Sequence, residues 1–240
     1  MLRVNWNYIK AFLLLVLVVF LYAFSSQRNQ QRNLTDLSVN FIGDENLYIT
    51  HETVNKLLIQ NDEGVTSVPK DILDLNELES ALNSNPMIKS AEVYVTVNGR
   101  FKADVEQRKP IARINTNTSF YIDEEGYSMP LSENHSARVP LVTGFINKDK
   151  LEEVYKIADR IYNDEFLKKH IVKIHQNKDK TISLKTRVFD FEIILGNLNH
   201  LDKKINNLKA FYQKAKNDNA LNNYSKVNLK FNNQVVCTKK

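Results

Sequence analysis

An uninterrupted apolar run near the N-terminus constrains this chain more than any other feature. The run "AFLLLVLVVFLYAF" spans Ala11–Phe24, and no charged residue occurs between Lys10 and Arg28. At 1.5 Å per residue the charge-free span reaches about 25 Å as a helix, slightly less than a hydrocarbon core of about 30 Å. Flanking basic side chains can extend to the interface, where flanking aromatic rings also prefer to lie. The residues suited to these anchoring roles are Trp6, Lys10, Tyr22 and Arg28.

The run predicts a single membrane-spanning helix over residues 11–27, after a cytoplasmic tail over residues 1–10. A cleaved signal peptide is the alternative, because Arg3 precedes the run and "AFS" at Ala23–Ser25 loosely matches a small-x-small cleavage site. The bulky residues Phe20 to Tyr22, just before that site, favour an uncleaved anchor. Export of the large C-terminal part is the simpler arrangement. It predicts a single-pass protein of the cell inner (cytoplasmic) membrane, with its bulk in the periplasm.

Charge and cysteine content argue against several classes of protein. The net charge is +5, but lysines and arginines are scattered among acids and form no block longer than a pair. We therefore expect no nucleic-acid binding, which needs a clustered basic footprint. Cys237 is the single cysteine, so no internal disulfide can stabilise the fold. The length of 240 residues allows one large or two small folded domains, and the apolar fraction of 42% is ordinary for globular protein.

The segment after the apolar run combines strand and helix patterns. The polar residues 28–36 predict a tether between membrane and fold. Alternation of apolar and polar residues over 37–41 predicts a strand with one buried face. Two helices are expected next. Thr50 can cap the first, and Asp74 and Glu77 form a capping box for the second.

The stretch "SAEVYVTVNGRFKADVEQRKPIARI", Ser90–Ile114, predicts a β-hairpin. Asn98 and Gly99 would supply the two positive-φ residues of a tight primed turn. The apolar residues that alternate with polar ones before the turn are Ala91, Val93, Val95 and Val97. Those after the turn are Phe101, Ala103 and Val105. Both helices can cover the apolar side of the resulting three-stranded sheet, which completes a two-layer domain.

This order of elements resembles the POTRA module, and more specifically that of the bacterial FtsQ/DivIB cell-division family. The resemblance rests on "LESALNSNPMIKSAEVYVTVNGRFKADVEQRKPIARI", in which a helix closes before a proline and a hairpin follows. The family pattern then ends with E-x-R-x-P-x-A. Here the matching residues are Glu106, Arg108, Pro110 and Ala112. The resemblance implies a POTRA domain over residues 37–114.

Residues 115–240 are expected to form the family's second, mainly β domain, beginning with "FYIDEEGYSMPLS" and "RVPLVTG". A helix should begin near Lys150, with Asp149 and Glu152 as its capping box, and another should cover 201–215. The predicted strands cover 171–174, 182–186, 189–195, 227–231 and 234–237. The complete prediction is an α+β fold. It has a single N-terminal transmembrane helix, a POTRA domain in β-α-α-β-β order, and a mixed, mainly β domain with two helices.

Catalytic and metal-binding patterns are poor throughout. His170 and His175 lie five residues apart and would face opposite sides of a strand, so they are poor candidates for a ligand pair. No Walker loop, G-x-S-x-G or H-E-x-x-H motif occurs. We therefore expect no catalytic residue, no cofactor and no metal, and the protein is expected not to be an enzyme.

Strand edges are the feature that suggests binding, because unpaired backbone groups can be completed by another chain. In the family, the second domain binds the small single-pass proteins FtsB and FtsL by strand addition, while the POTRA domain and membrane helix serve recruitment. The resemblance therefore implies FtsB/FtsL-type and FtsK-type divisome partners. The partner-binding residues it implies are Val227, Leu229, Lys230, Phe231, Gln234, Val235 and Val236.

Several alternatives remain open on the sequence. Phe231 could be a core residue and Lys230 a solvated one. Some family members carry a further aromatic residue beyond the last strand, where this chain has residues 237–240 without one. The expected function is a non-enzymatic divisome scaffold that helps control septal peptidoglycan synthesis. The alternatives are a POTRA-bearing protein of transport or outer-membrane assembly, and a secreted binding module.

Overall fold

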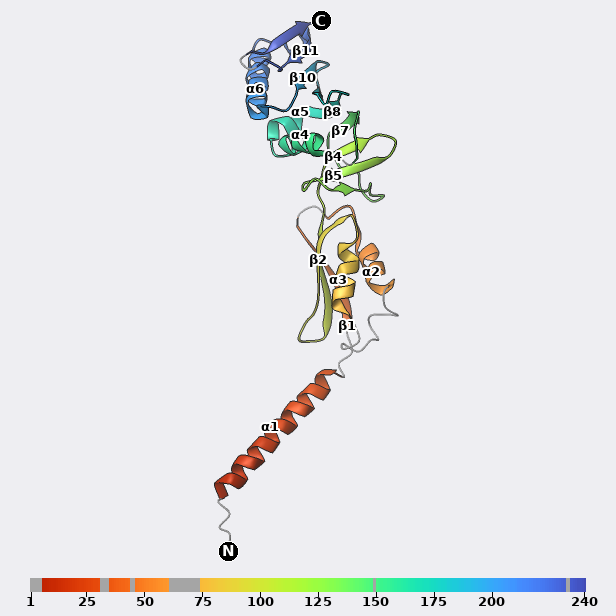
Figure 1. The fold of residues 1–240 in the computed structure, drawn as a ribbon, viewed down its shortest axis with the longest axis vertical. Helices are drawn as coiled ribbons and strands as arrows, with labels where there is room; N and C mark the ends of the chain where they lie inside the picture. Colours follow the sequence, from red (N-terminus) through yellow and green to blue (C-terminus); the bar gives the residue numbers. More distant parts are fainter. Residues whose placement is uncertain (1–5, 31–34, 44–45, 61–73, 149, 232–233) are drawn as a thin grey trace. The chain divides into compact units, whose positions relative to one another are not determined.

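The chain divides into two compact units, residues 1–107 and 108–240, each with its own core. The computed structural model describes residues 6–30, 35–43, 46–60, 74–148, 150–231 and 234–240 (Figure 1). The units are treated separately below. Together they give the predicted α+β class, with an apolar helix, a small mixed sheet and a large mixed sheet.

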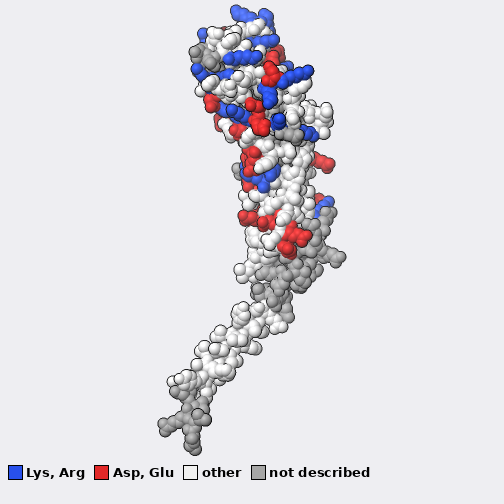
Figure 2. Space-filling view, in the orientation of Figure 1, with Lys and Arg blue, Asp and Glu red and all other residues white. Residues whose placement is uncertain are grey.

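The apolar run forms one long helix, α1, from Trp6 to Gln30. Its segment Trp6–Gln27 has a mean hydropathy of 2.3 and is long and apolar enough to cross a membrane. Trp6 and Tyr22 are exposed, as is Lys10, and the visible face of α1 is uncharged in Figure 2. The side chain of Arg28 lies outside the described residues. Among the described residues nothing buries this segment, which is consistent with a single-pass membrane anchor.

The rest of the first unit has the predicted β-α-α-β-β order. Its elements are β1 (Thr35–Ile42), α2 (His51–Gln60), α3 (Leu75–Asn83), β2 (Ile88–Val95) and β3 (Arg100–Gln107). The sheet order is β1-β3-β2, with β1 parallel and β2 antiparallel to β3. The two helices lie against one face of this sheet (Figure 1) and bury Val54, Leu58, Leu78 and Leu82 against it.

Local capping places both helices as predicted. Thr50 Oγ1 accepts a hydrogen bond from the Thr53 amide at 3.2 Å. Asp74 Oδ1 accepts from the amides of Asn76 at 3.0 Å and Glu77 at 3.2 Å, which satisfies two orphan donors of α3.

The hairpin turn differs from the prediction. Only Gly99 has a positive φ, +81°, whereas Asn98 does not. The Thr96 amide donates to the Arg100 carbonyl at 2.9 Å, so the loop contains three residues and Val97 is 87% exposed. A three-residue loop with glycine in the left-handed position also matches the strand twist, and the dipeptide alone does not distinguish it from the two-residue form.

The second unit is built on a nine-stranded mixed sheet. The strands are β4 (Pro110–Asn115), β5 (Ser119–Asp123), β6 (Ser128–Met129), β7 (Leu141–Gly144), β8 (Ile171–Gln176), β9 (Ile182–Thr186), β10 (Glu192–Gly196), β11 (Tyr224–Asn228) and β12 (Val236–Lys239). Their order is β12-β11-β10-β9-β8-β7-β4-β5-β6. The sheet edges are therefore β12 and β6.

Helices α4 (Glu152–Tyr162), α5 (Glu165–His170) and α6 (Leu201–Asn217) cover one face of this sheet. Strand register places one row of buried side chains beneath them, and these are Ile114, Val142, Ile174, Leu184, Ile193 and Val227. Since neighbouring residues on a strand point to opposite faces, Lys173, Lys185, Glu192 and Lys226 form the adjacent row on the other face.

Several boundaries differ from expectation. Strand β4, which the sequence places in the POTRA domain, pairs with β5 and β7, so the junction falls at 107/108 and not at 114/115. Helix α4 begins at Glu152 after Leu151, which makes no side-chain capping bond, and Asp149 lies outside the described residues. Helix α5 is an additional helix, capped by Asp164.

Candidate functional site

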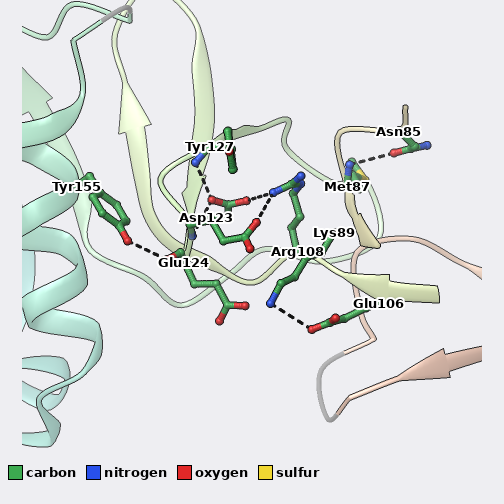
Figure 3. Close-up of polar contacts among 10 residues, drawn as sticks. Asn85, Met87, Lys89, Glu106, Arg108, Asp123, Glu124, Tyr127 and Tyr155 are labelled. Atoms are coloured by element: carbon green, nitrogen blue, oxygen red, sulfur yellow. Dashed lines mark hydrogen bonds and ion pairs between the residues drawn. The ribbon is translucent and has the colours of Figure 1, made fainter. Parts of the chain in front are cut away.

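Arg108 of the E-x-R-x-P-x-A motif holds the beginning of the second unit together. Arg108 Nη1 donates to Asp123 Oδ2 at 2.6 Å and to Glu125 Oε2 at 3.1 Å (Figure 3). Asp123 is 1% exposed, and its other oxygen accepts from the amides of Glu125 at 3.0 Å and Tyr127 at 2.7 Å. Arg108 therefore neutralises a buried carboxylate that shapes the turn after β5.

The other motif residues also have structural contacts. Glu106, in β3, forms an ion pair with Lys89 at 3.3 Å. Pro110 and Ala112, in β4, are buried. Within the described residues, the four motif residues thus contribute ion pairs and buried packing. None of them belongs to the surface at the C-terminal strands.

Strand β12 leaves one edge of the large sheet open. It pairs antiparallel with β11 on one side and has no neighbour on the other in the described chain. The Lys240 amide donates to the Asn223 carbonyl at 2.9 Å. The Lys239 carbonyl accepts a hydrogen bond from Ser225 Oγ on β11 at 3.1 Å. Because amide directions alternate along a strand, the amides of Thr238 and Val236 also face β11, while those of Cys237 and Lys239 face the free edge. These outward groups can pair with an added strand.

The structure divides the predicted partner-binding residues into two groups. Val227 and Leu229 are 0% and 1% exposed and belong to the core. Val235 packs against the same core. The residues at the surface are Lys230, Phe231, Gln234 and Val236, with Phe231 46% exposed. Phe231 is therefore not a core residue, which was the alternative for it, and β11 ends at Asn228, before Lys230 and Phe231.

A basic row on the open face of the sheet lies next to this edge. Lys173 is the cross-strand neighbour of Lys185, which neighbours Glu192, which in turn neighbours Lys226. A hollow of about 210 Å³ opens here, lined by Lys173, His175, Ser183, Leu184, Lys185 and Glu192. In Figure 2 the visible face of the second unit carries many Lys and Arg side chains among fewer Asp and Glu. A net positive face favours an acidic partner.

The first unit has a hollow of its own, beside the outer strand β1. It measures about 470 Å³ and lies between that strand and the beginning of α2. Its lining residues are Val39, Asn40, Phe41, Asn46, Leu47, Ile49, Thr50 and His51. The strand pairs only with β3, so its outer edge is also free in the described chain.

His170, His175 and Cys237 each have surroundings that favour a structural role. His170 lies at the end of α5, where its Nδ1 is 2.7 Å from the Phe166 carbonyl oxygen. His175 lies on β8, 3.0 Å from Thr143 Oγ1. No group of three or more metal-ligating side chains occurs in the described part of the chain. Burial raises the pKa of the Cys237 thiol, which disfavours the reactive thiolate.

Two residues that the sequence analysis did not single out are Gly196, the last residue of β10, and Lys204 on α6. Lys204 is 5% exposed, and its ammonium donates to the carbonyl oxygens of Leu195 and Asn197, which flank Gly196. The signal that could have identified Lys204 is its place in the helical stripe. It falls three residues after Leu201 and four before Leu208, on the buried face of α6.

Comparisons with known proteins match both units. The family described as "FtsQ/DivIB, C-terminal related" matches residues 109–238, and the POTRA-like domain matches residues 37–106. Cell division protein FtsQ of Geotalea daltonii is 21% identical over 179 residues, which cover 70% of this chain and 64% of that protein. Cell division protein DivIB of Clostridium tetani is 27% identical over 182 residues, covering 67% of this chain and 65% of that protein. The chain thus spans just under two thirds of each relative.

Proposed function

Because this chain belongs to the FtsQ/DivIB family, we propose that it is a non-enzymatic scaffold of the cell-division machinery. It binds small single-pass partners of the FtsB/FtsL type and helps to control septal peptidoglycan synthesis through them. The observation that carries the proposal is the free edge of β12, with Lys230, Phe231 and Val236 exposed beside it. Main-chain hydrogen bonds at such an edge supply affinity, and alternate side chains supply specificity.

The proposal also assigns an orientation in the membrane. The helix α1 anchors the protein in the inner membrane, residues 1–10 lie in the cytoplasm, and both folded units lie on the outer side at the division septum. The length and apolar character of α1 support a spanning role. Recovery of the protein in membrane fractions with its N-terminus intact tests this. A mature N-terminus near residues 25–26 would instead identify a cleaved signal peptide.

The two units have separate tasks under this proposal. The second unit captures the partner strand at β12, and the basic row Lys173, Lys185 and Lys226 attracts acidic side chains. The first unit contributes to recruitment by FtsK-type proteins. The hollow beside β1 and the free edge of that strand support this role, because they offer apolar contacts and backbone pairing together.

Depletion of the protein from its own cells tests the function directly, with a fluorescent copy followed in parallel. Filamentous cells with unfinished septa and a midcell band are the expected result. Normal division with a diffuse envelope signal would overturn the division role. Co-purification of the FtsB/FtsL-type proteins of the same cell, from wild type and from the Phe231→Ala variant, then tests the site at β12.

A further inference from the structure

The side chain of Lys230 packs against the backbone of a glycine at the end of β10. Gly196, the last residue of that strand, has φ +71°. A Cβ at Gly196 would be 2.8 Å from Lys230 Cγ, 3.3 Å from Cε and 3.4 Å from Cδ. The aliphatic stem of Lys230 therefore lies flat against Gly196, in space that any other residue would occupy.

The backbone that carries Lys230 is held to the same strand. The Leu229 amide donates to the Ile194 carbonyl at 2.8 Å, beyond the last paired residues of β10 and β11. The Lys230 amide donates to Asn228 Oδ1 at 3.0 Å. Since Leu229 is itself buried, the root of the Lys230 side chain cannot shift without breaking core contacts.

Lys204 fixes the backbone on both sides of Gly196 in the chain. Its Nζ donates to the Leu195 carbonyl at 2.9 Å, the Asn197 carbonyl at 2.6 Å and Asn197 Oδ1 at 3.1 Å. These bonds join the residues on both sides of Gly196 to α6. No carboxylate pairs with this ammonium among the described residues, and burial, with a smaller contribution from the charge of Lys230, lowers its pKa.

Among the described residues the Lys230 ammonium has no ion-pair or hydrogen-bond partner. The carbonyl oxygens of Leu195 and Asn197, on either side of Gly196 in the chain, accept from Lys204. Two ammonium groups so placed repel each other, which directs Lys230 outward. The positive charge of Lys230 acts on the carboxylate of Asp179. Its pKa is lowered first by the Thr181 hydroxyl and last by Lys230, yet no ion pair joins Asp179 to Lys230 in the described chain.

We propose that Gly196 and Lys204 are positioning residues that present Lys230, with its stem fixed and its ammonium unpaired, to a carboxylate of the bound partner strand. The inference rests on the proposed function of the β12 edge and adds two positioning residues to it. A lysine that is already ordered loses less side-chain entropy on binding, so the same ion pair yields higher affinity.

Side-chain NMR relaxation tests the ordering without any partner. In the full-length protein in micelles, with ¹³C-labelled lysine, the Cδ and Cε groups of Lys230 should be more ordered than those of Lys214, an exposed lysine on α6. In the Gly196→Ala variant, the order of the Lys230 Cδ and Cε groups should fall to that of Lys214. Gly43→Ala is the matched control, because Gly43 also has a positive φ but no atom within 4 Å of the added Cβ. Equal mobility of Lys230 and Lys214 in wild type would overturn the inference.

Partner capture tests the consequence. The probe is the co-expressed FtsB/FtsL-type protein of the same cell. Gly196→Ala and Lys230→Ala should each weaken capture about tenfold, and the double variant should be no weaker than Lys230→Ala alone. Lys204→Met provides a second route, because it frees the carbonyl oxygens and should draw Lys230 inward, with lower reactivity of Lys230 toward an acylating reagent.

The outcomes separate the two claims. If the wild type captures the partner and Gly196→Ala mobilises Lys230 without weakening capture, the positioning role is wrong and the scaffold function stands. If the wild type captures no partner although Lys230 is ordered, the proposed function fails and the positioning role fails with it. If Gly196→Ala does not fold, an unchanged acylation rate at Lys230 in Lys204→Met overturns the inference.

Discussion

Arg108 Nη1 lies 2.6 Å from Oδ2 of the buried Asp123, and this contact joins the beginning of the second unit to the turn after β5. The same guanidinium lies 5.1 Å from the ring centre of Tyr127. A single arginine thus satisfies a desolvated charge and covers the turn that this charge organises. Arg108 belongs to the E-x-R-x-P-x-A motif, which was identified by its resemblance to a family pattern. Its contacts give it a structural role in the second unit.

Replacement of Arg108 should destabilise the second unit. In Arg108→Ala the Asp123 carboxylate stays buried without its counter-charge, and a loss of about 3 kcal/mol is expected. Urea unfolding of the full-length protein in micelles, followed by circular dichroism, measures it. The control is Lys89→Ala, which removes the more exposed ion pair with Glu106 and should cost less than about 1 kcal/mol. Similar losses in both variants would contradict the assignment.

Stability should also depend on Asp164 at low pH. Burial alone would raise the pKa of Asp164, but hydrogen bonds from Lys209 and Arg160 prevail and lower it to about 2. A carboxyl whose pKa is lower in the folded state than in the unfolded state stabilises the fold at pH values above its unfolded-state pKa. That stabilisation, about 2 kcal/mol at neutral pH, should disappear as pH falls from about 4 toward 2.

The measurement is the unfolding free energy of wild type and Asp164→Asn at several pH values. The difference between them should be largest near neutral pH and should shrink below pH 4. Asp202→Asn, which removes a mostly exposed partner of Arg160, is the control and should show little difference at any pH. A constant difference between wild type and Asp164→Asn from pH 7 to pH 2 would contradict the pKa assignment.

Two neighbouring apolar residues should respond in opposite ways. Leu229 is 1% exposed and Phe231 is 46% exposed. Leu229→Ala should cost about 3 kcal/mol of stability, because it leaves a cavity in the core. Phe231→Ala should cost less than about 1 kcal/mol and weaken partner capture. Thermal unfolding and co-purification of both variants measure the contrast. A loss of stability in Phe231→Ala equal to its loss of capture would make Phe231 structural.

Proline substitutions in β12 should separate the free edge from the paired edge. The Lys239 amide faces outward, so Lys239→Pro should block strand addition by a partner while the β11–β12 pairing remains. The Thr238 amide faces β11, so Thr238→Pro should break that pairing and expose its amides. Hydrogen exchange at β11 and co-purification of the partner measure the two effects. Protection of β11 that is lost equally in both variants would show that the edge is assigned the wrong way.

Sequence periodicity and capping were sufficient to predict most elements of the first unit. Thr50 and Asp74 cap helices because their side chains bond amides two or three residues away, and such short-range contacts follow from local sequence. Strands β2 and β3 followed from alternation in the same way. The hairpin loop was wrong by one residue, since Asn-Gly is compatible with more than one loop length.

The candidate site was predicted less completely. The partner-binding role of residues 227–236 stays a prediction. Within that segment Lys230 and Phe231 are exposed, whereas Val227 and Leu229 belong to the core. Gly196 and Lys204 were not identified, because they come from β10 and α6 and contribute only through contacts with residues distant in sequence. The spacing of residues along a strand shows which of them lie on the same face of the sheet. Which face is buried depends on the helix that packs against the sheet.

By itself, the sequence determined the apolar helix, the order of the small domain and the family pattern, because periodicity, caps and motif spacing act over a few residues. Tertiary structure alone decided that β4 pairs within the second sheet, that β12 forms its free edge among the described strands, and that Lys204 is buried with its ammonium on the backbone at the end of β10. These features depend on pairing and packing between segments far apart in the chain. A strand carries the same alternation whichever neighbour completes its hydrogen bonds.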